Sequence, residues 1–397
     1  MNCPICNHHD SQLLFAQQCA PIYQHPLAPE CEIPQPHYLD LEYRFCTNCG
    51  HGFQSHFDGN LMDRIYANHY YTPAPDNIGH QFRDEFFTAI SSIIATLQPG
   101  CRILEIGSSS GELLATFKQK ISQPYLMGYE PSQNSAAAAQ QLGIPTRCEF
   151  FSLTSVQVEH QPYDVIVSRH VIEHIVDFSA FWQAIAHISH DQTRVLLETP
   201  SLEFAMAKPS IAPFHVEHAH VFSAHSLATL AAHYGWYAEQ QHVTSAGNMV
   251  LSFVKDKTKL TTINLPTFNN SALELLGWQA KRLTKEMGSQ KIILWGAGAG
   301  GLSLICAHHL QPELLVDGNP NKHGKKFCGQ PWIVAYGPEA ITKLQQDPSR
   351  NRNIEEYSII IGSTFYREIR AQLAALNWQG GIISPYEWDL SSNQEEA

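Results

Sequence analysis

Short apolar runs alternate with helical patterns through the middle of the chain. The runs predict strands, because each is short and largely apolar, and they are Ile103–Ile106, Tyr125–Tyr129, Val165–Val167 and Arg194–Leu197. Between them, apolar residues recur at helical spacing and predict helices over Leu113–Gln119, Gln133–Leu142 and Phe178–Ile188. Such alternation over residues 86–255 is typical of a doubly wound parallel sheet in an α/β fold.

The pattern changes on both sides of this region. Residues 1–60 are loop-rich and too polar to form a good core alone, so we expect an additional cross-link to stabilise them. The polar stretch Lys255–Asn270 predicts a linker, and Ser271–Met287 predicts one helix. A second α/β pattern begins at Lys291–Gly296. We therefore predict three domains, a small module over 1–60, an α/β domain over 61–255 and a Rossmann-like α/β domain over 256–397.

Composition narrows the classes of partner. The chain has 397 residues, 44% hydrophobic and 16% charged, which is enough to bury several cores. Its net charge is −12 without a basic cluster, which argues against nucleic acid, because phosphate binding needs concentrated positive charge. The first residues do not resemble a signal peptide, and no apolar run is long enough for a membrane span. We expect a cytoplasmic protein, monomeric or a small homo-oligomer, without a membrane partner.

Two Cys-x-x-Cys pairs near the N-terminus predict a metal site. Cys3 and Cys6 form the first pair, and Cys46 and Cys49 form the second. Each pair directs two thiolates toward one point, and four thiolates suit Zn²⁺ in a closed, structural site. The same pattern favours a reducing compartment over a disulfide scaffold. His8, His9 and His51 remain alternative ligands, and two unrelated cysteine pairs remain the alternative interpretation.

A glycine turn follows the first predicted strand of the middle domain. The segment Glu105-Ile-Gly107-Ser-Ser-Ser-Gly111 opens into a helical pattern, and the next strand ends at Glu130. Glycines allow a sharp turn and close approach to a ligand, and helix-start amides bind anions. An acid at the end of the second strand accepts hydrogen bonds from ribose hydroxyls in dinucleotide folds. Another Rossmann-like nucleotide binder is the competing interpretation.

Together with Asp164–His174, these segments resemble the class I S-adenosylmethionine (SAM) methyltransferases. The resemblance implies SAM as the cofactor, held in place so that its methyl group is aimed at a nucleophile. We expect the cofactor-binding residues to be Tyr71, Glu105, Gly107, Gly111, Glu130, Pro131, Arg169 and His170.

A histidine-rich segment, Phe214–Ser223, follows the strand that carries Glu198, Thr199 and Pro200. Loops at the carboxyl ends of the strands carry ligand contacts in such sheets. His218 beside Glu217 has the composition of a general base with an orienting acid. Two other interpretations stay open, a metal site that uses His215, Glu217, His218 and His220, and a polar surface loop.

The second α/β pattern has its own glycine turn. Gly296-Ala-Gly298-Ala-Gly-Gly301 follows a predicted strand, and Asp317 comes at the spacing of a ribose-binding acid. The turn predicts a site for the nucleotide part of a substrate, a scaffold without a ligand, or an NAD site.

The order of these segments resembles the three-domain sugar C-methyltransferases, which act on nucleotide-linked keto-deoxysugars. The cysteine pairs, the SAM domain, Glu217-His218 and a tail motif at Leu315–Gly324 carry the resemblance, which covers nearly the whole chain. By resemblance, His218 is the base that takes the proton α to the ketone, Glu217 is its partner and His170 is a neighbour of the reacting centre. We assign His215 to the same catalytic group, although the family usually has Tyr there.

The family's C-terminal turn usually includes Lys where this chain has Gly300. This departure and His215 both fall near the expected sugar-nucleotide side. The leading hypothesis is therefore a SAM-dependent C-methyltransferase of a nucleotide-linked keto-deoxysugar. The alternatives are an O- or N-methyltransferase of another small metabolite, and a non-catalytic SAM-binding partner in a biosynthetic complex.

Overall fold

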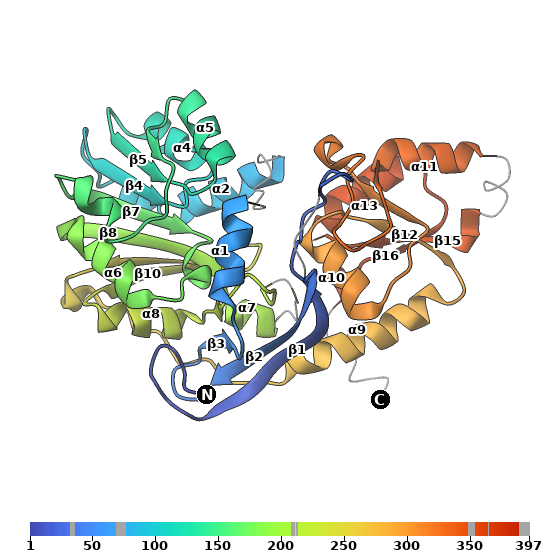
Figure 1. The fold of residues 1–397 in the computed structure, drawn as a ribbon, viewed down its shortest axis with the longest axis horizontal. Helices are drawn as coiled ribbons and strands as arrows, with labels where there is room; N and C mark the ends of the chain where they lie inside the picture. Colours follow the sequence, from blue (N-terminus) through green and yellow to red (C-terminus); the bar gives the residue numbers. More distant parts are fainter. Residues whose placement is uncertain are drawn as a thin grey trace. The chain divides into compact units, whose positions relative to one another are not determined.

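The computed structural model describes residues 1–31, 36–68, 77–207, 211, 213–347, 354–363 and 365–388. The chain forms two compact units (Figure 1). Unit 1 contains Met1–Gln12, Arg44–Phe204 and Glu217–Phe268, and unit 2 contains Leu13–Tyr43, Ala205–Val216 and Asn269–Ala397. The division into residues 1–60, 61–255 and 256–397 stays a prediction.

Unit 1 is built on a seven-stranded sheet in the order β10-β11-β8-β7-β4-β5-β6. Its strands are β4 Arg102–Ile106, β5 Tyr125–Tyr129, β6 Thr146–Arg147, β7 Tyr163–Arg169, β8 Ser189–Pro200, β10 Tyr237–Val243 and β11 Asn248–Val254. Strands β4 to β8 pair in parallel, whereas β11 runs antiparallel to both β8 and β10. The chain runs outward from β4 to β6 and then returns to β7, so the strand order reverses beside β4, where α/β folds bind ligands.

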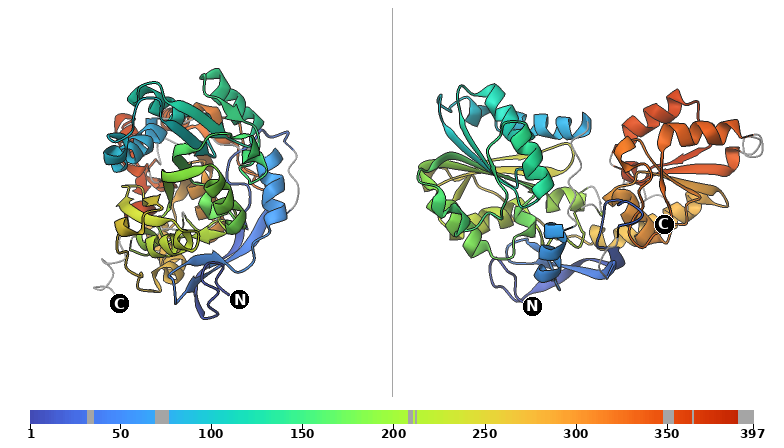
Figure 2. Two further views of the ribbon diagram at one scale, coloured as in Figure 1. Left: turned by 90° about the vertical axis from the view of Figure 1, so that its left-hand side faces the viewer. Right: turned by 45° about the horizontal axis from the view of Figure 1, so that its top comes forward.

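Helices cover both faces of this sheet, as the two views of Figure 2 also show. One face packs against α2 Asn77–Ala89, α3 Ser91–Ile94, α4 Glu112–Lys120 and α5 Gln133–Gln141, and the other against α6 Phe178–His187 and α8 Ala224–His233. The central strands read as continuous apolar runs because both of their faces are buried. Two further helices are α1 Gly59–Asn68 and α7 Leu202–Ala207.

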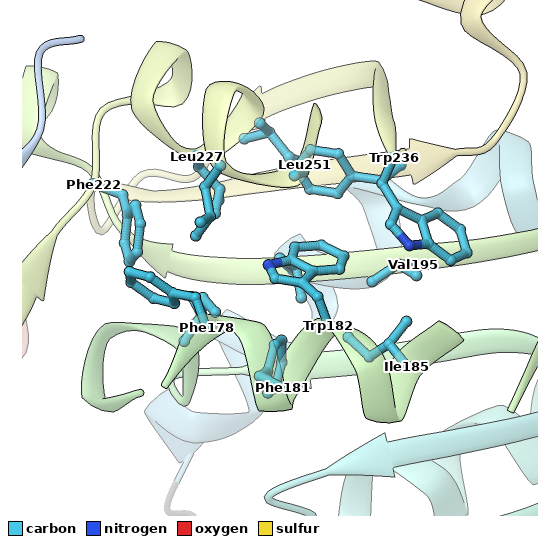
Figure 3. Packing of buried hydrophobic residues seen from close by; sticks show 14 of the residues in the cluster. Phe178, Phe181, Trp182, Ile185, Val195, Phe222, Leu227, Trp236 and Leu251 are labelled. Carbon is cyan, nitrogen blue, oxygen red and sulfur yellow. The ribbon is translucent and has the colours of Figure 1, made fainter. Parts of the chain in front are cut away.

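The core on the α6 face is rich in aromatic residues (Figure 3). Helix α6 places Phe178, Phe181, Trp182 and Ile185 on one face, since they recur at positions i, i+3, i+4 and i+7. Trp182 stands 6.3 Å from Trp236, measured between ring centroids. This packing fixes the position of the segment just before α6, which carries part of the candidate site.

The first 60 residues contain more regular structure than the expected loop-rich module. A four-stranded sheet has the order β1-β2-β3-β9, with β1 Ser11–Pro21, β2 Tyr38–Cys46, β3 Gly52–Gln54 and β9 His220–Val221. Buried positions in β1 and β2 are interspersed with exposed polar ones, so the mean polarity of the segment conceals its strands.

Unit 2 contains a five-stranded parallel sheet in the order β14-β13-β12-β15-β16. The strands are β12 Lys291–Trp295, β13 Leu314–Asp317, β14 Val334–Tyr336, β15 Tyr357–Ile361 and β16 Gly381–Ile383. One core includes residues of α9 Ser271–Met287 and α10 Ala299–His308, and a second includes residues of α11 Gly337–Gln346 and α13 Tyr366–Ala375. The predicted fold class is confirmed, since the protein is α/β with class I and Rossmann-like sheets.

Short 3₁₀ turns connect several elements, namely η1 Ser155–Val158, η2 Ile172–His174, η3 Lys257–Lys259, η4 Pro320–Lys322, η5 Ile354–Glu356 and η6 Pro385–Glu387. Among the described residues, no helix has the length and apolar character that crossing a membrane requires.

Candidate active site

A cavity of about 790 Å³ opens at the carboxyl ends of β4, β5 and β7 in unit 1. Six residues predicted to bind the cofactor line it: Glu105, Gly107, Glu130, Pro131, Arg169 and His170. The cavity lies where the strand order reverses and has the volume of a small-molecule site. Tyr71, also predicted to bind the cofactor, lies outside the described residues.

The glycine turn after β4 needs both of its predicted glycines. Gly107 has φ of +72°, and a Cβ there would come within 2.5 Å of Val171 Cγ2. Gly111 has φ of +78° and a Cβ there would lie 2.9 Å from Ala139 Cβ, so this residue packs the start of α4 against α5. Of the two glycines, Gly107 lines the cavity and Gly111 does not.

Two buried carboxyl groups, those of Glu105 and Glu130, face the turn. Glu130 follows β5, and its carboxylate accepts hydrogen bonds from the backbone N–H of Ser109 at 2.9 Å and of Ser132 at 2.8 Å. Burial raises the pKa of Glu130, although these two amides oppose the shift. Each carboxylate oxygen can accept more than one hydrogen bond, so Glu130 retains acceptor capacity for a ligand.

Burial raises the pKa of Glu105 to about 8, partly opposed by the positive charge of Arg169. Its Oε2 is buried and accepts no hydrogen bond from the described residues. A buried polar atom in this state is costly unless a ligand or water satisfies it. The cavity therefore fits a bound molecule with a donor or a positive charge near β4.

The end of β7 carries a second ionic group. Arg169 Nε pairs closely with Glu198 Oε2 from the neighbouring strand β8. The Arg169 guanidinium also lies over the ring of Phe86, 4.9 Å from its centroid. This pair fixes Arg169 at the cavity wall and supplies positive charge beside Glu105.

His170 leaves the strand in a left-handed conformation, with φ of +53°. Its backbone N–H donates to the Glu198 carbonyl at 2.8 Å, and its side chain is 43% exposed. Partial burial lowers its pKa, but the contact with Glu173 and the charges of Glu198 and Glu173 outweigh this effect and raise the pKa above its ordinary value. A histidine with raised basicity thus lines the cavity.

A carboxylate that sequence reasoning did not select lies among the histidines. Glu173 in η2 is fully buried, with Oε1 3.4 Å from His170 Nδ1 and 3.9 Å from His218 Nε2. Burial alone would raise its pKa, but His170, His174 and His218 lower the pKa of Glu173 to about 2. Glu173, His174 and His218 bring ligand atoms within 4.8 Å of one another.

His174 and His218 stack edge to face, with centroids 4.9 Å apart. The carbonyl of Glu217 accepts a hydrogen bond from His174 Nδ1 at 2.8 Å, which places the proton of a neutral ring on Nδ1. Burial lowers the pKa of His174. His170 and His174 line the cavity, while His218 is buried and is not among the lining residues.

The structure does not pair Glu217 with His218 through their side chains. Among the described residues, the Glu217 carboxyl group accepts no hydrogen bond and joins no ion pair, and burial raises its pKa to about 7. His218 Nε2 lies instead 3.9 Å from Glu173 Oε1. His215 belongs to unit 2, where its carbonyl accepts a hydrogen bond from the Tyr43 hydroxyl at 2.8 Å. The catalytic roles of Glu217, His218, His215 and His170 stay predictions.

His220 serves a different set of contacts. Its Nε2 donates to the Ile175 carbonyl at 3.1 Å, so Nδ1 accepts from His51 Nε2 at 3.0 Å. Burial lowers the pKa of His220 to about 3, which keeps the ring neutral. His51 and His220 therefore connect the cysteine region to the residue that follows η2.

The four predicted cysteine ligands form one cluster in unit 1. Sγ atoms stand 3.6 Å apart for Cys3 and Cys49 and 3.5 Å apart for Cys6 and Cys46, and all four lie within 4.8 Å of one another. Tetrahedral Zn–S bonds of about 2.3 Å require sulfur–sulfur separations of roughly 3.8 Å. The donor set and its spacing therefore fit zinc. Each pair is followed by a left-handed residue, Asn7 or Gly50, which closes the turn.

The second glycine turn, in unit 2, is filled by the protein's own atoms. A Cβ on Gly300 would overlap the Tyr386 hydroxyl, and one on Gly301 would overlap the Gly296 carbonyl. Asp317 accepts from the backbone N–H of Ala297 at 2.7 Å and pairs with Lys322 Nζ at 3.0 Å. The acid expected to bind a ribose therefore already has a basic partner.

Comparisons with known proteins place the matching region around the unit 1 cavity. The family described as "Methyltransferase domain" matches residues 78–241. No curated protein matches the chain.

Solved structures similar to half of the chain are also methyltransferases. A magnesium protoporphyrin IX methyltransferase from Synechocystis PCC 6803 with bound SAM is 15% identical, with a TM-score of 0.36, and the match covers 51% of this chain and 99% of that one. A SAM-dependent methyltransferase from Aquifex aeolicus is 10% identical, with a TM-score of 0.37, over 51% of this chain and 100% of that one. The plantazolicin methyltransferase in complex with S-adenosylhomocysteine (SAH) is 12% identical, with a TM-score of 0.37, and the match covers 50% of this chain and 90% of that one.

The family match covers β4, β5, β7 and most of the residues that line the cavity. Residues 78–241 therefore form a methyltransferase domain, and the protein is a SAM-dependent methyltransferase.

Proposed function

We propose that this enzyme methylates a carbon next to a carbonyl group, and that its substrate is a nucleotide-linked keto-deoxysugar. The observation that carries the proposal is the fully buried carboxylate of Glu173 between His218 and His170, of which His170 lines the cavity. Carbon becomes a nucleophile only after it is deprotonated, so C-methylation needs a strong, positioned base. The substrate class rests on the resemblance to three-domain sugar C-methyltransferases.

In this proposal, different residues of unit 1 bind the cofactor and remove the proton. The turn at Gly107 and the carboxylate of Glu130 hold SAM, with Glu130 accepting from the ribose hydroxyls. His218 removes the proton α to the carbonyl, and its imidazole becomes an imidazolium. When bound, SAM supplies the methyl group, so that a C–C bond forms at the deprotonated carbon, the S–CH₃ bond breaks and SAH remains. Glu173 balances the positive charge on the histidines.

The first test separates cofactor binding from proton abstraction. Native mass spectrometry of the purified protein reports retained SAM or SAH and any nucleotide sugar. With a nucleotide-linked keto-deoxysugar in D₂O and without SAM, we expect deuterium to enter the α-carbon. His218→Ala abolishes this exchange and turnover but keeps SAH binding, whereas His242→Ala, at an exposed position, changes neither. Turnover without any α-exchange would favour attack by oxygen or nitrogen and would overturn the proposal.

We also propose that Cys3, Cys6, Cys46 and Cys49 hold one structural Zn²⁺. Four thiolates fill a tetrahedral site and leave no open position for chemistry. Metal analysis should give one zinc per chain, and Cys49→Ser should lower both the zinc content and the melting temperature. Cys148→Ser, at an exposed cysteine outside the cluster, is the matched control. Full zinc content in Cys49→Ser would contradict the assignment.

A further inference from the structure

Glu173 is a fully buried acid beside the cavity residue His170. The whole residue is 0% exposed, and neither of its oxygens accepts a hydrogen bond of good geometry from a described residue. An ionised carboxylate without donors is costly to bury, because no dipole replaces the lost hydration. Its charge must therefore be balanced by positive charge nearby.

The groups around Glu173 identify that positive charge. On η2 and the preceding loop, His170 Nδ1 lies 3.4 Å from Oε1 and His174 lies beside it. From the segment before β9, His218 Nε2 lies 3.9 Å from the same oxygen. Glu198 on β8 faces His170 at 3.8 Å, but it is already paired with Arg169. Burial raises the pKa of Glu217 to about 7, and as an acid Glu217 supplies no positive charge to balance Glu173.

We propose that Glu173 is the positioning residue of the base, a carboxylate shared by His218 and His170 that stabilises the imidazolium formed when the substrate's α-proton is removed. This inference rests on the proposed function. It differs from the predicted Glu217–His218 pair, because the acid comes from η2 rather than from the residue before the base.

The shared carboxylate has a chemical consequence. When the C–H bond breaks, its proton moves to the His218 imidazole, and the electron pair stays on the substrate carbon. An opposite charge within about 4–6 Å stabilises a cationic imidazole and raises its pKa by about 1–3 units. His170, which contacts the same Oε1 and lines the cavity, gives the excess proton a second acceptor on the way to solvent.

The experiment measures histidine titrations directly and needs no substrate. Protein labelled with ¹³C at histidine Cε1 is titrated by NMR, and His170→Asn and His218→Asn assign the two signals. We expect Glu173→Gln to lower the pKa of both histidines by about 1 unit or more. Glu217→Gln is the matched control, because Glu217 is a second, partly buried glutamate next to His218, and it should shift neither pKa by a comparable amount. Glu173→Asp keeps the charge and should keep most of the raised pKa.

Binding of SAH, measured by calorimetry, separates two kinds of failure. If wild-type protein does not bind SAH, the proposed function fails, whatever the titrations show. If SAH binds but Glu173→Gln leaves both pKa values unchanged, the role of Glu173 is overturned. A second tightly bound metal ion besides the cysteine-held zinc, lost in Glu173→Gln, would also overturn it, since Glu173, His174 and His218 would then be ligands. Should Glu173→Gln fail to fold, the pKa of His218 is measured in Glu173→Asp and in His170→Asn instead, and this pKa decides whether Glu173 stabilises the His218 imidazolium.

Discussion

The molecule contains two glycine turns with the same local design and different surroundings. Gly107 follows β4 and Gly296 follows β12, each at the end of a central parallel strand. In both units an acid stands where the neighbouring strand ends, since Glu130 directly follows β5 and Asp317 is the last residue of β13. Glu130 borders a cavity of about 790 Å³, whereas Asp317 pairs with Lys322.

The difference shows that the turn motif specifies backbone shape and the surrounding side chains decide whether a ligand fits. In unit 1 the nearest neighbour of Gly107 is one methyl group of Val171. In unit 2 a Cβ on Gly296 would meet the Gly362 carbonyl, and a Cβ on Gly300 would overlap the Tyr386 hydroxyl. The same glycines can thus serve a cofactor in one sheet and internal packing in another.

The largest effect should come from closing the first turn. Gly107→Ala places a Cβ 2.5 Å from Val171 Cγ2 and forces a left-handed alanine. A displacement of about 1 Å there should lower turnover roughly 100-fold, with weaker SAM binding by calorimetry. Gly143→Ala is the matched control, because Gly143 has φ of +71° but open space around it. Normal SAM binding in Gly107→Ala would show that the turn does not approach the cofactor.

The two acids give the next test. Glu130→Gln removes a charged acceptor, and the loss of about 1.5–3 kcal/mol should weaken binding of both SAM and SAH by roughly 10- to 100-fold. Asp317→Asn should leave both affinities unchanged and instead destabilise unit 2 by about 1–3 kcal/mol, because it breaks the Lys322 pair. Calorimetry and denaturant unfolding measure the two effects. Equal loss of cofactor affinity in both variants would erase the distinction between the turns.

A smaller change tests the packing in unit 2. Gly300→Ala brings a methyl group against the Tyr386 hydroxyl and should cost about 1–3 kcal/mol of stability, as overpacking does. Adding Tyr386→Phe should restore part of this loss. Gly277→Ala, in open space within α9, should be neutral or stabilising by up to about 1 kcal/mol. A Gly300→Ala variant as stable as the wild type would mean that the turn has room for a ligand.

The smallest effect concerns pH and Glu105. Its pKa is raised to about 8 in the folded protein from an ordinary 4.5, so the folded state keeps a proton that the unfolded chain loses. The stability contribution of this group therefore declines as pH rises from about 4.5 to 8. SAM carries one more positive charge than SAH, so its affinity relative to SAH should rise a few-fold between pH 7 and 9 as the carboxylate forms. Glu105→Gln should abolish this pH dependence of the SAM affinity relative to the SAH affinity. If the ratio of the two affinities does not change with pH in the wild type, Glu105 does not lie near the sulfonium.

The sequence was sufficient for elements with a dominant hydrophobic signal. Strands β4, β5 and β7 and helix α6 fall at the predicted places, because the strands are buried on both faces and α6 has one apolar face. Strand β8 is longer than predicted, since its first half is polar. Strands β1 and β2 were missed for the same reason.

The candidate site was harder to predict than the sheet. The turn and Glu130 follow from local pattern, because one strand and one loop contain all the information. The acid beside His218 does not, because Glu173 reaches it through the η2 turn and the left-handed bend at His170. Adjacency in sequence favoured Glu217, yet neighbouring residues outside a strand or helix need not share a direction. The Glu173-His174 dipeptide was visible in the sequence, but nothing local related it to His218.

The division of the N-terminal region between the units bears on how the protein is synthesised. Residues Leu13–Tyr43 belong to unit 2, whose remaining long segment begins at Asn269. On a ribosome that adds about 5–20 residues per second, the early segment waits on the order of 10 seconds or more for its partners. During that time the segment lacks the residues that later cover its apolar side chains, among them Phe15, Ile22 and Tyr43, which are fully buried in the finished protein. The nascent chain thus presents apolar side chains to chaperones while unit 1 is still emerging.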